Sequence, residues 1–328
     1  MPKALITTVP FADKNRQPLD SLEQARIDYV INPLGRKLKE DELAEMIASF
    51  DVLIAGTEPI TEKVMANADQ LKLISRVGVG LDSVDLLAAE RRGIQVSYTP
   101  DAPAAAVSEL SIGLMLTLLR SIHLSNVRMH EGGWHRFFGR RIPEVTIGII
   151  GAGRIGGGVI NRLAGFGVSR ILVNEIQRDS FENTSRITLE YVDKETIYRM
   201  ADVISLHVPL TAQTKNMIRQ EQLMQMKSDA LLINTARGGI VNEHDLAEVM
   251  NAGHLGGAAI DVFDHEPYSG PLAQIERCVL TAHMGSMSID CRTRMEIEAT
   301  GEAVRFLTGK ALQGLVPSEE YDVQREGL

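Results

Sequence analysis

Three glycines between an apolar run and a helical pattern constrain the fold of this chain more than any other feature. Gly151, Gly153 and Gly156 follow the continuous apolar run from Val145 to Ile150, and a further apolar run, RILVNE, comes after the helical pattern. The segment therefore predicts a strand, a helix and a second strand of a parallel sheet. In that frame, G-x-G-x-x-G is typical of a turn that binds a dinucleotide, because its glycines permit the tight turn, the approach of a pyrophosphate and close helix packing. The residues expected to hold the phosphates at this helix start are Gly151, Gly153, Arg154, Ile155 and Gly156.

An acidic residue at the end of the second strand usually binds the ribose hydroxyls of the adenosine half of the cofactor. Here the strand ends in Asn174 and Glu175, with asparagine where the acid is more usual. Glu175 can supply the carboxylate after a shift of one residue, and a carboxylate there repels the 2′-phosphate of NADP. We therefore predict NAD as the cofactor. The alternative is that Glu175 is a solvated side chain and that Asn174 makes a weaker ribose contact.

Composition limits the class of protein. The chain has 328 residues, which predicts two domains because a domain usually holds roughly 100 to 200 residues. A net charge of −9 argues against nucleic acid as a partner. The start lacks the build of a signal peptide and the most apolar stretch is interrupted by polar residues, so we expect a cytoplasmic protein that does not enter a membrane. The two cysteines and eight histidines lack the spacing of metal ligands, so no metal is predicted.

Short apolar runs alternate with amphipathic stretches, a pattern that predicts parallel strands joined by helices. We expect an α/β protein with two Rossmann-like or flavodoxin-like parallel-sheet domains. The NAD-binding domain at 100–285 is inserted in a discontinuous substrate domain at 1–99 and 286–328. The active site is expected in the cleft between them, with long helices near 104–129 and 287–307 as hinges. The first should be a single buried helix that also packs in a subunit interface, and the polar end, PSEEYDVQREGL, is expected to be loose.

Three side chains of complementary chemistry follow the glycine turn: Arg237 in NTARGGIV, Glu266 in DVFDHEP and His283 in LTAHMGS. Histidine exchanges protons near neutral pH, a carboxylate partner fixes its ring, and arginine offers a planar fork to a substrate carboxylate. Beside a nicotinamide, this set suits hydride transfer coupled to proton transfer on a substrate oxygen. We therefore predict these three as the catalytic residues. Taken singly, each has a structural alternative: a satisfied histidine, a capping or ion-pairing arginine, and a glutamate that closes a turn.

Five segments, in order and with matching spacing, resemble the NAD-dependent D-2-hydroxyacid dehydrogenases: GAGRIGGGV, LHVPLTAQT, INTARGGIVNEHDL, GAAIDVFDHEP and LTAHMGS. The segments SRVGVGLDSVDLLAAERRGI and EGGWHRFFGRRIPEVTIGIIG look closest to the 3-phosphoglycerate dehydrogenase branch, whose frequent regulatory domain is not seen here. Ala282 stands where the family commonly has proline, so the histidine loop has one restraint fewer.

The resemblance also implies roles for single residues. The amides of Val79 and Gly80 would hold the substrate carboxylate together with Arg237, and His283 would also contact the substrate. Arg76 would contact a distal phosphate or carboxylate, with a surface salt bridge as the alternative, and Asp261 would accept from the nicotinamide carboxamide. The other expected cofactor contacts are His207, Pro209, Thr214, Thr235, Ala236, Arg237, His283 and Gly285.

The resemblance implies that a D-2-hydroxy acid and its 2-keto acid are interconverted, with 3-phosphoglycerate and 3-phosphohydroxypyruvate as the first substrates to test. Glyoxylate, hydroxypyruvate or a sugar acid are alternatives within the class, and an NAD-sensing binding protein of the corepressor type is an alternative outside it. We expect a homodimer. Trp134, Phe137 and Phe138 are expected in a dimer contact, at a neighbouring active site or in the core.

Overall fold

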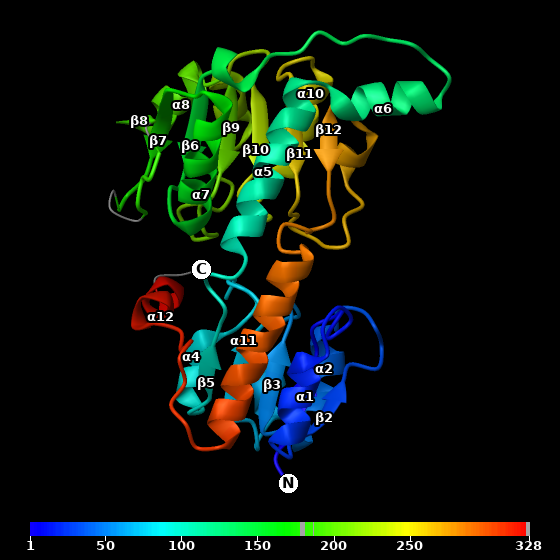
Figure 1. Cartoon of the computed structure of the whole chain (residues 1–328), viewed down its shortest axis with the longest axis vertical. Coiled ribbons are helices and arrows are strands. Elements are labelled where there is room, and N and C mark those ends of the chain that lie inside the picture. Colours follow the sequence, from blue (N-terminus) through cyan, green and yellow to red (C-terminus); the bar gives the residue numbers. More distant parts are fainter. Residues whose placement is uncertain (178–180, 186, 326–328) are drawn as a thin grey trace. The chain divides into compact units, whose positions relative to one another are not determined.

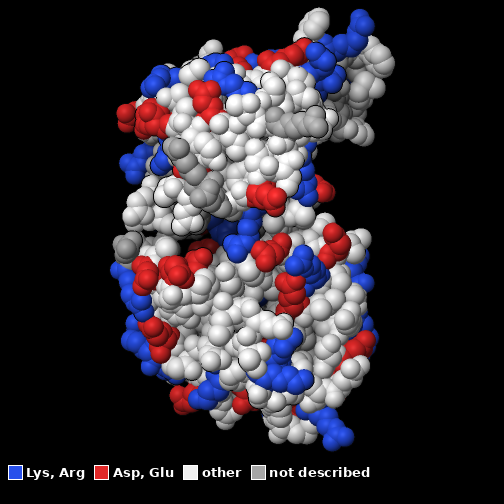
Figure 2. Space-filling model, turned by 60° about the vertical axis from the view of Figure 1, so that its left-hand side comes forward, with Lys and Arg blue, Asp and Glu red and all other residues white. Residues whose placement is uncertain are grey.

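The computed structural model describes residues 1–177, 181–185 and 187–325. The chain divides into two compact units, one formed by Met1–Pro103 with Met287–Leu328 and the other by Ala104–Ser286 (Figure 1). Both units are α/β and each has a parallel sheet, which confirms the predicted fold class. On the face drawn in Figure 2, acidic and basic side chains are interspersed.

The discontinuous unit is built on a five-stranded parallel sheet in the order β2-β1-β3-β4-β5. Its strands are β1 (Lys3–Ile6), β2 (Asp28–Ile31), β3 (Val52–Ala55), β4 (Leu73–Arg76) and β5 (Gln95–Ser97). Its helices are α1 (Gln17–Gln24), α2 (Glu40–Met46), η1 (Ile47–Ser49), α3 (Glu62–Ala66), α4 (Leu86–Arg91), α11 (Ile289–Leu307) and α12 (Ser318–Arg325). The long helix α11 packs on β3 and β4 (Figure 1), whereas apolar side chains of α2, α3 and α4 share a core with the strands.

Residues 318–325 of the polar end form helix α12, so the prediction of a loose tail was wrong for them, and the part of that prediction that falls on 326–328 lies outside the described residues. The side-chain amide of Gln324 donates to the carbonyl oxygen of Val84 at 2.7 Å and accepts from the amide of Leu86 at 2.9 Å. Arg325 pairs with Glu90 of α4 at 2.8 Å. These polar contacts attach α12 to α4, and an apolar pattern alone does not predict them.

The second unit is built on a seven-stranded parallel sheet in the order β12-β11-β10-β9-β6-β7-β8. Its strands are β6 (Ile147–Ile150), β7 (Arg170–Asn174), β8 (Thr188–Tyr191), β9 (Val203–Leu206), β10 (Leu231–Asn234), β11 (Gly257–Ile260) and β12 (Cys278–Leu280). Its helices are α5 (Ala104–Leu119), α6 (Ile122–His130), η2 (Ile142–Glu144), α7 (Arg154–Leu163), η3 (Ala164–Phe166), α8 (Lys194–Met200), α9 (Gln220–Gln225), α10 (Glu243–Asn251) and η4 (Pro271–Gln274). The direction of strand order reverses between β6 and β9, and ligands of such sheets bind at the carboxyl ends of strands beside this switch point.

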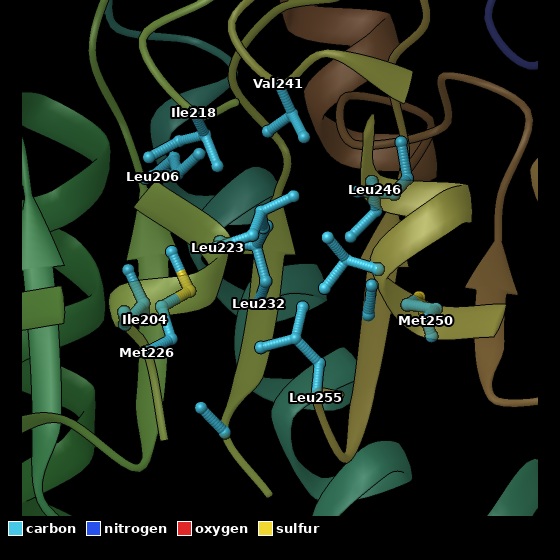
Figure 3. Packing of buried hydrophobic residues seen from close by; sticks show 14 of the residues in the cluster. Ile204, Leu206, Ile218, Leu223, Met226, Leu232, Val241, Leu246, Met250 and Leu255 are labelled. Atoms are coloured by element: carbon cyan, nitrogen blue, oxygen red, sulfur yellow. The ribbon is translucent and has the colours of Figure 1, made fainter. Parts of the chain in front are cut away.

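Both faces of this sheet are covered, which explains why its central strands are continuous apolar runs. Ile204, Leu206 and Leu232 pack with side chains of α9 and α10 (Figure 3), and side chains of α8 belong to the same core. Their sequence neighbours Val203 and Ile233 point to the opposite face, where α5 and α7 complete a second core. Successive strand residues therefore serve two different cores.

The expected single helix near 104–129 is two helices, so that prediction was wrong. Helix α5 ends at Leu119 and α6 begins at Ile122, with a bend of 64° between them. Ser121 lies in the left-handed region at φ 49°, which interrupts the helical backbone. Helix α5 is largely buried, but α6 has no buried residue. Within the described residues, no single helix is long and apolar enough to cross a membrane, and only the bent α5–α6 pair reaches that length and apolarity together.

Candidate active site and cofactor turn

The glycine turn connects β6 to α7 with a very close backbone approach. Gly151 has φ 89°, and a Cβ atom there would lie 2.7 Å from the carbonyl carbon of His207. A Cβ atom on Gly156 would lie 2.0 Å from the carbonyl oxygen of Gly151. In contrast, a Cβ atom on Gly153 would meet nothing within 4 Å, and Gly153 caps α7 without a side-chain hydrogen bond. The start of α7 therefore has the open, amide-rich form that suits a pyrophosphate.

Asn174 and Glu175, at the end of β7, have different surroundings. The Asn174 side chain donates to the carbonyl oxygen of Val192 at 2.9 Å, away from the turn. The Glu175 carboxylate accepts from the amide of Ala152 at 2.6 Å and from the amide of Gln177 at 2.9 Å. Of the two residues, it is Glu175 whose carboxylate lies at the glycine turn.

His207 follows β9 and supports the glycine turn. Its Nε2 lies 2.9 Å from Ser205 Oγ, and its amide donates to the carbonyl oxygen of Ile150 at 2.8 Å. Its Nδ1 is buried and has no hydrogen-bond partner among the described residues. Burial lowers the pKa of His207 to about 4, so the ring is neutral at physiological pH. Pro209 and Thr214, which were also expected to contact the cofactor, lie in the loop after β9. Thr214 Oγ1 donates there to the carbonyl oxygen of Pro209 at 2.6 Å.

His283 and Glu266, which are separated in sequence, are in direct contact. His283 Nδ1 lies 3.0 Å from both carboxylate oxygens of Glu266. Since a carboxylate accepts, Nδ1 carries the proton and Nε2 remains for exchange with a ligand. Glu266 also accepts from the amide of Phe263 at 3.2 Å, which fixes the carboxylate on the loop after β11. The His283 side chain is 37% exposed and that of Glu266 is 24% exposed, so the imidazole can meet a ligand.

Asp261 holds the histidine loop, residues 281–285, through both of its carboxylate oxygens. It accepts from Thr281 Oγ1 at 2.6 Å, from the amide of Met284 at 2.9 Å and from the amide of Gly285 at 2.9 Å. The amide of His283 donates to the Asp261 carbonyl oxygen at 2.8 Å. His283 itself has φ 48°, a conformation that is uncommon for a residue other than glycine. Asp261 is therefore the anchor of the loop that presents the imidazole.

Arg237 follows β10, the strand next to β11. Its Nη1 donates to the carbonyl oxygen of Ala236 at 2.7 Å, and its own carbonyl oxygen accepts from the Asn234 side chain at 2.9 Å. A Cβ atom on the next residue, Gly238, would lie 2.0 Å from the backbone of Phe263, so the Arg237 loop lies against the loop that carries Glu266. Thr235 and Ala236 are buried, and Thr235 Oγ1 lies 2.8 Å from Ser111 Oγ of α5.

The loop after β4, residues 77–80, belongs to the discontinuous unit. The amide of Gly78 donates to Thr99 Oγ1 at 2.9 Å and its carbonyl oxygen accepts from the amide of Thr99 at 3.0 Å. Within the described part of the chain, the amides of Val79 and Gly80 donate to no protein acceptor. Two neighbouring amide donors without a protein acceptor are suited to bind an anion. Arg76 is buried just before them, with its guanidinium on backbone carbonyl groups.

Three positioning side chains were not found from the sequence: Thr99, Ser205 and Thr281. Thr99 and Thr281 contact residues that follow a neighbouring strand, whereas Ser205 contacts His207 at the end of its own strand, and a lone serine or threonine gives no sequence signal for such a partner. Among the described residues, no group of three or more His, Cys, Asp or Glu side chains is placed to hold a metal ion.

Residues 112–285 match the family model "D-isomer specific 2-hydroxyacid dehydrogenase, NAD binding domain". A hydroxypyruvate reductase of Thermotoga maritima is 36% identical over 268 residues, or 80% of this chain and 86% of the relative. A D-3-phosphoglycerate dehydrogenase of Methanocaldococcus jannaschii is 37% identical over 286 residues, or 84% of this chain and 52% of the relative. The crystal structure of the TT0316 protein from Thermus thermophilus has a TM-score of 0.87 and 32% identity, and the match covers 96% of this chain and 100% of that one.

The turn, the sheet and the His283–Glu266 pair define an NAD-linked oxidoreductase. The chain belongs to the NAD-dependent D-2-hydroxyacid dehydrogenases, which confirms the resemblance seen in the sequence. NAD fits the observed residues, because the open side of Gly153 faces the start of α7 and the Glu175 carboxylate lies beside it.

Proposed function

We propose that this enzyme interconverts a small D-2-hydroxy acid and its 2-keto acid, with hydroxypyruvate and glyoxylate as the keto acids to test first. The observation that carries the proposal is the His283–Glu266 pair, an acid–base set in the unit that also has the glycine turn. Similarity over 86% of the length of the hydroxypyruvate reductase supports these substrates. The phosphorylated substrates expected from the sequence stay a prediction, and the chain matches about half the length of the phosphoglycerate dehydrogenase relative.

In this proposal the residues act as follows. Bound NAD supplies the chemistry of hydride exchange at its nicotinamide. His283 Nε2 donates a proton to the substrate carbonyl oxygen during reduction and accepts it back from the hydroxyl during oxidation. Glu266 holds the imidazole in place through Nδ1. Arg237 offers its guanidinium to the substrate carboxylate, and in the other unit the amides of Val79 and Gly80 are donors of the kind that bind a carboxylate.

We assign NAD preference to Glu175. The 2′-phosphate of NADP would meet a carboxylate already held at the glycine turn by the amide of Ala152. Replacing Glu175 by Ser should bring the Michaelis constant for NADPH closer to that for NADH. A wild-type enzyme that prefers NADPH would contradict the assignment.

We also propose a homodimer in which α6 and the segment after it are covered by a second copy. Helix α6 has no buried residue, and its apolar side chains Ile122, Val127 and Met129 are exposed. Trp134 is 81% exposed and Phe138 is fully exposed, so neither lies in the core of this chain. Sedimentation equilibrium should give twice the chain mass, and Trp134→Ser with Phe138→Ser should shift it toward the monomer.

The function is tested by following nicotinamide absorbance with a panel of 2-keto acids and NADH. Turnover of hydroxypyruvate or glyoxylate, lost in His283→Gln, is the expected result. Absence of turnover with every acid, together with tight NADH binding, would instead support the NAD-sensing binding protein that the sequence left as the alternative.

A further inference from the structure

Arg76 ends β4 at the carboxyl edge of the five-stranded sheet, and its side chain is only 3% exposed. Its Nε and Nη2 donate to the carbonyl oxygen of Gly80 at 3.0 and 2.8 Å. Its Nη1 donates to the carbonyl oxygen of Ala55 at 3.2 Å and to that of Gly56. The guanidinium group therefore joins the loop after β3 to the 77–80 loop.

This contact fixes the 77–80 loop on a second side. Thr99, which follows β5, holds Gly78, the amide of Val77 donates to the carbonyl oxygen of Ala55 at 2.9 Å, and Arg76 holds Gly80. The two amides between these restraints, those of Val79 and Gly80, keep one orientation without a protein acceptor in the described chain. Because an anion site gains affinity from preorganised donors, Arg76 contributes through these amides.

The same corner contains a buried carboxylate. Glu58 is 1% exposed, and its Oε1 accepts from the amide of Gly56 at 3.0 Å and from Thr7 Oγ1. Gly56 therefore lies between the two charged groups, since its carbonyl oxygen accepts from Arg76. A phosphoryl group carries about two negative charges and needs charged donors that are not matched by nearby carboxylates. To reach Arg76 it would have to displace backbone carbonyl groups and approach Glu58.

We propose that Arg76 is a positioning residue for the carboxylate-binding amides of the 77–80 loop, and that the enzyme selects 2-hydroxy and 2-keto acids with an uncharged tail over phosphorylated ones. The inference rests on the proposed function and gives Arg76 a different role from the distal-group contact expected from the sequence. The preference for an uncharged tail follows from the charge balance between Arg76 and Glu58.

The test measures ligand binding without turnover. D-glycerate and 3-phospho-D-glycerate are titrated calorimetrically into the enzyme saturated with NADH, where both partners are reduced and no hydride moves. The wild-type enzyme should bind D-glycerate more tightly. Arg76→Gln should weaken both ligands by the same factor, about 10- to 100-fold, because hydrogen bonds to a charged group are lost. The affinity for NADH should not change.

Three variants keep the test decisive. Arg76→Lys should weaken both ligands as Arg76→Gln does, because an ammonium group cannot span three carbonyl groups. Thr99→Val, which loosens the loop from the other side, should weaken both equally and by less. Arg277→Gln is the control, since Arg277 also donates to backbone carbonyl groups, those of Leu255 and Met250, in the other unit; it should change neither affinity.

Two results would overturn the inference: tighter wild-type binding of 3-phospho-D-glycerate, or an Arg76→Gln variant that loses affinity for this ligand alone and regains it with lysine. A failure of the proposed function has a different signature, namely no reduction of any 2-keto acid. In that case the binding ratios still decide the role of Arg76.

Discussion

The glycine turn and the histidine loop both place a residue in the left-handed region within a few residues of a strand end, but they do so by different means. Gly151 has φ 89° and needs no support, because glycine has no Cβ atom. His283 has φ 48° and is held there by Asp261, whose oxygens accept from the loop on either side. The turn is specified by its own residues, whereas the loop is specified by a carboxylate from another strand. A cofactor site can therefore be local in sequence while the acid–base site beside it is not.

The largest effect should come from removing the imidazole that the loop presents. In His283→Gln we expect turnover to fall by about 10²- to 10⁴-fold, the usual contribution of a general acid or base, while NADH affinity stays unchanged because the turn is intact. Stopped-flow absorbance and a fluorescence titration measure the two quantities. His265→Gln is the control, since that histidine lies beside Glu266 with a 96% exposed side chain. Equal turnover in both variants would remove His283 from the mechanism.

A smaller effect is expected from the anchor of the loop. Asp261→Asn loses one charged acceptor and should lower turnover about 10- to 100-fold. Thr281→Val removes a single donor to Asp261 and should have a milder effect. If the histidine loop is as independent of distant residues as the turn, Asp261→Asn will leave turnover near the wild-type value.

A substitution in the glycine turn should lower the stability of the fold. Gly156→Ala places a Cβ atom 2.0 Å from the Gly151 carbonyl oxygen and should lower the free energy of unfolding by about 1–3 kcal/mol. Gly165→Ala is the matched control, because a Cβ atom there meets nothing within 4 Å. Urea denaturation of the two variants gives the difference. Identical midpoints would show that the close approach in the turn is dispensable.

An effect confined to acidic pH is expected from His207, which supports the turn in its neutral form. Its pKa of about 4 in the folded state lies below the ordinary value of 6.5, so the unfolded chain binds more protons between these pH values. The contribution of neutral His207 to the free energy of unfolding is complete above pH 6.5. It is lost as the pH falls toward 4, and the loss amounts to at most about 3 kcal/mol. His207→Gln should flatten the stability profile in this window, as measured by denaturation at several pH values. A slope unchanged by the substitution would assign the pH dependence to other groups.

Continuous apolar runs predicted the central strands, because each serves two cores. Two of the edge strands, β2 and β8, have no continuous apolar run and are not predicted in this way: each alternates between exposed and half-buried residues, and each pairs with a strand on one side. The break at Ser121 was also missed, since an unusual backbone angle at a serine has no compositional signal.

For the candidate site, the residue types predicted the contact between the catalytic side chains, but they did not predict the backbone conformation that presents them. The contact of Glu266 with His283 followed from the residue types, and the structure brings the two side chains together. Resemblance named Asp261 as a cofactor contact, but its part in holding the histidine loop depends on hydrogen bonds that cross from β11 to the end of β12.

The division of the chain also sets an order for folding during synthesis. The unit of residues 104–286 is continuous, so all of its strands are synthesised before α11. The other unit begins with the first residue but needs α11 on its sheet and α12 on α4. Since domains fold as units, the unit that contains the first residues completes its fold last. Helices α2–α4 can pack on one face of its sheet before α11, which packs on the other face, has been made.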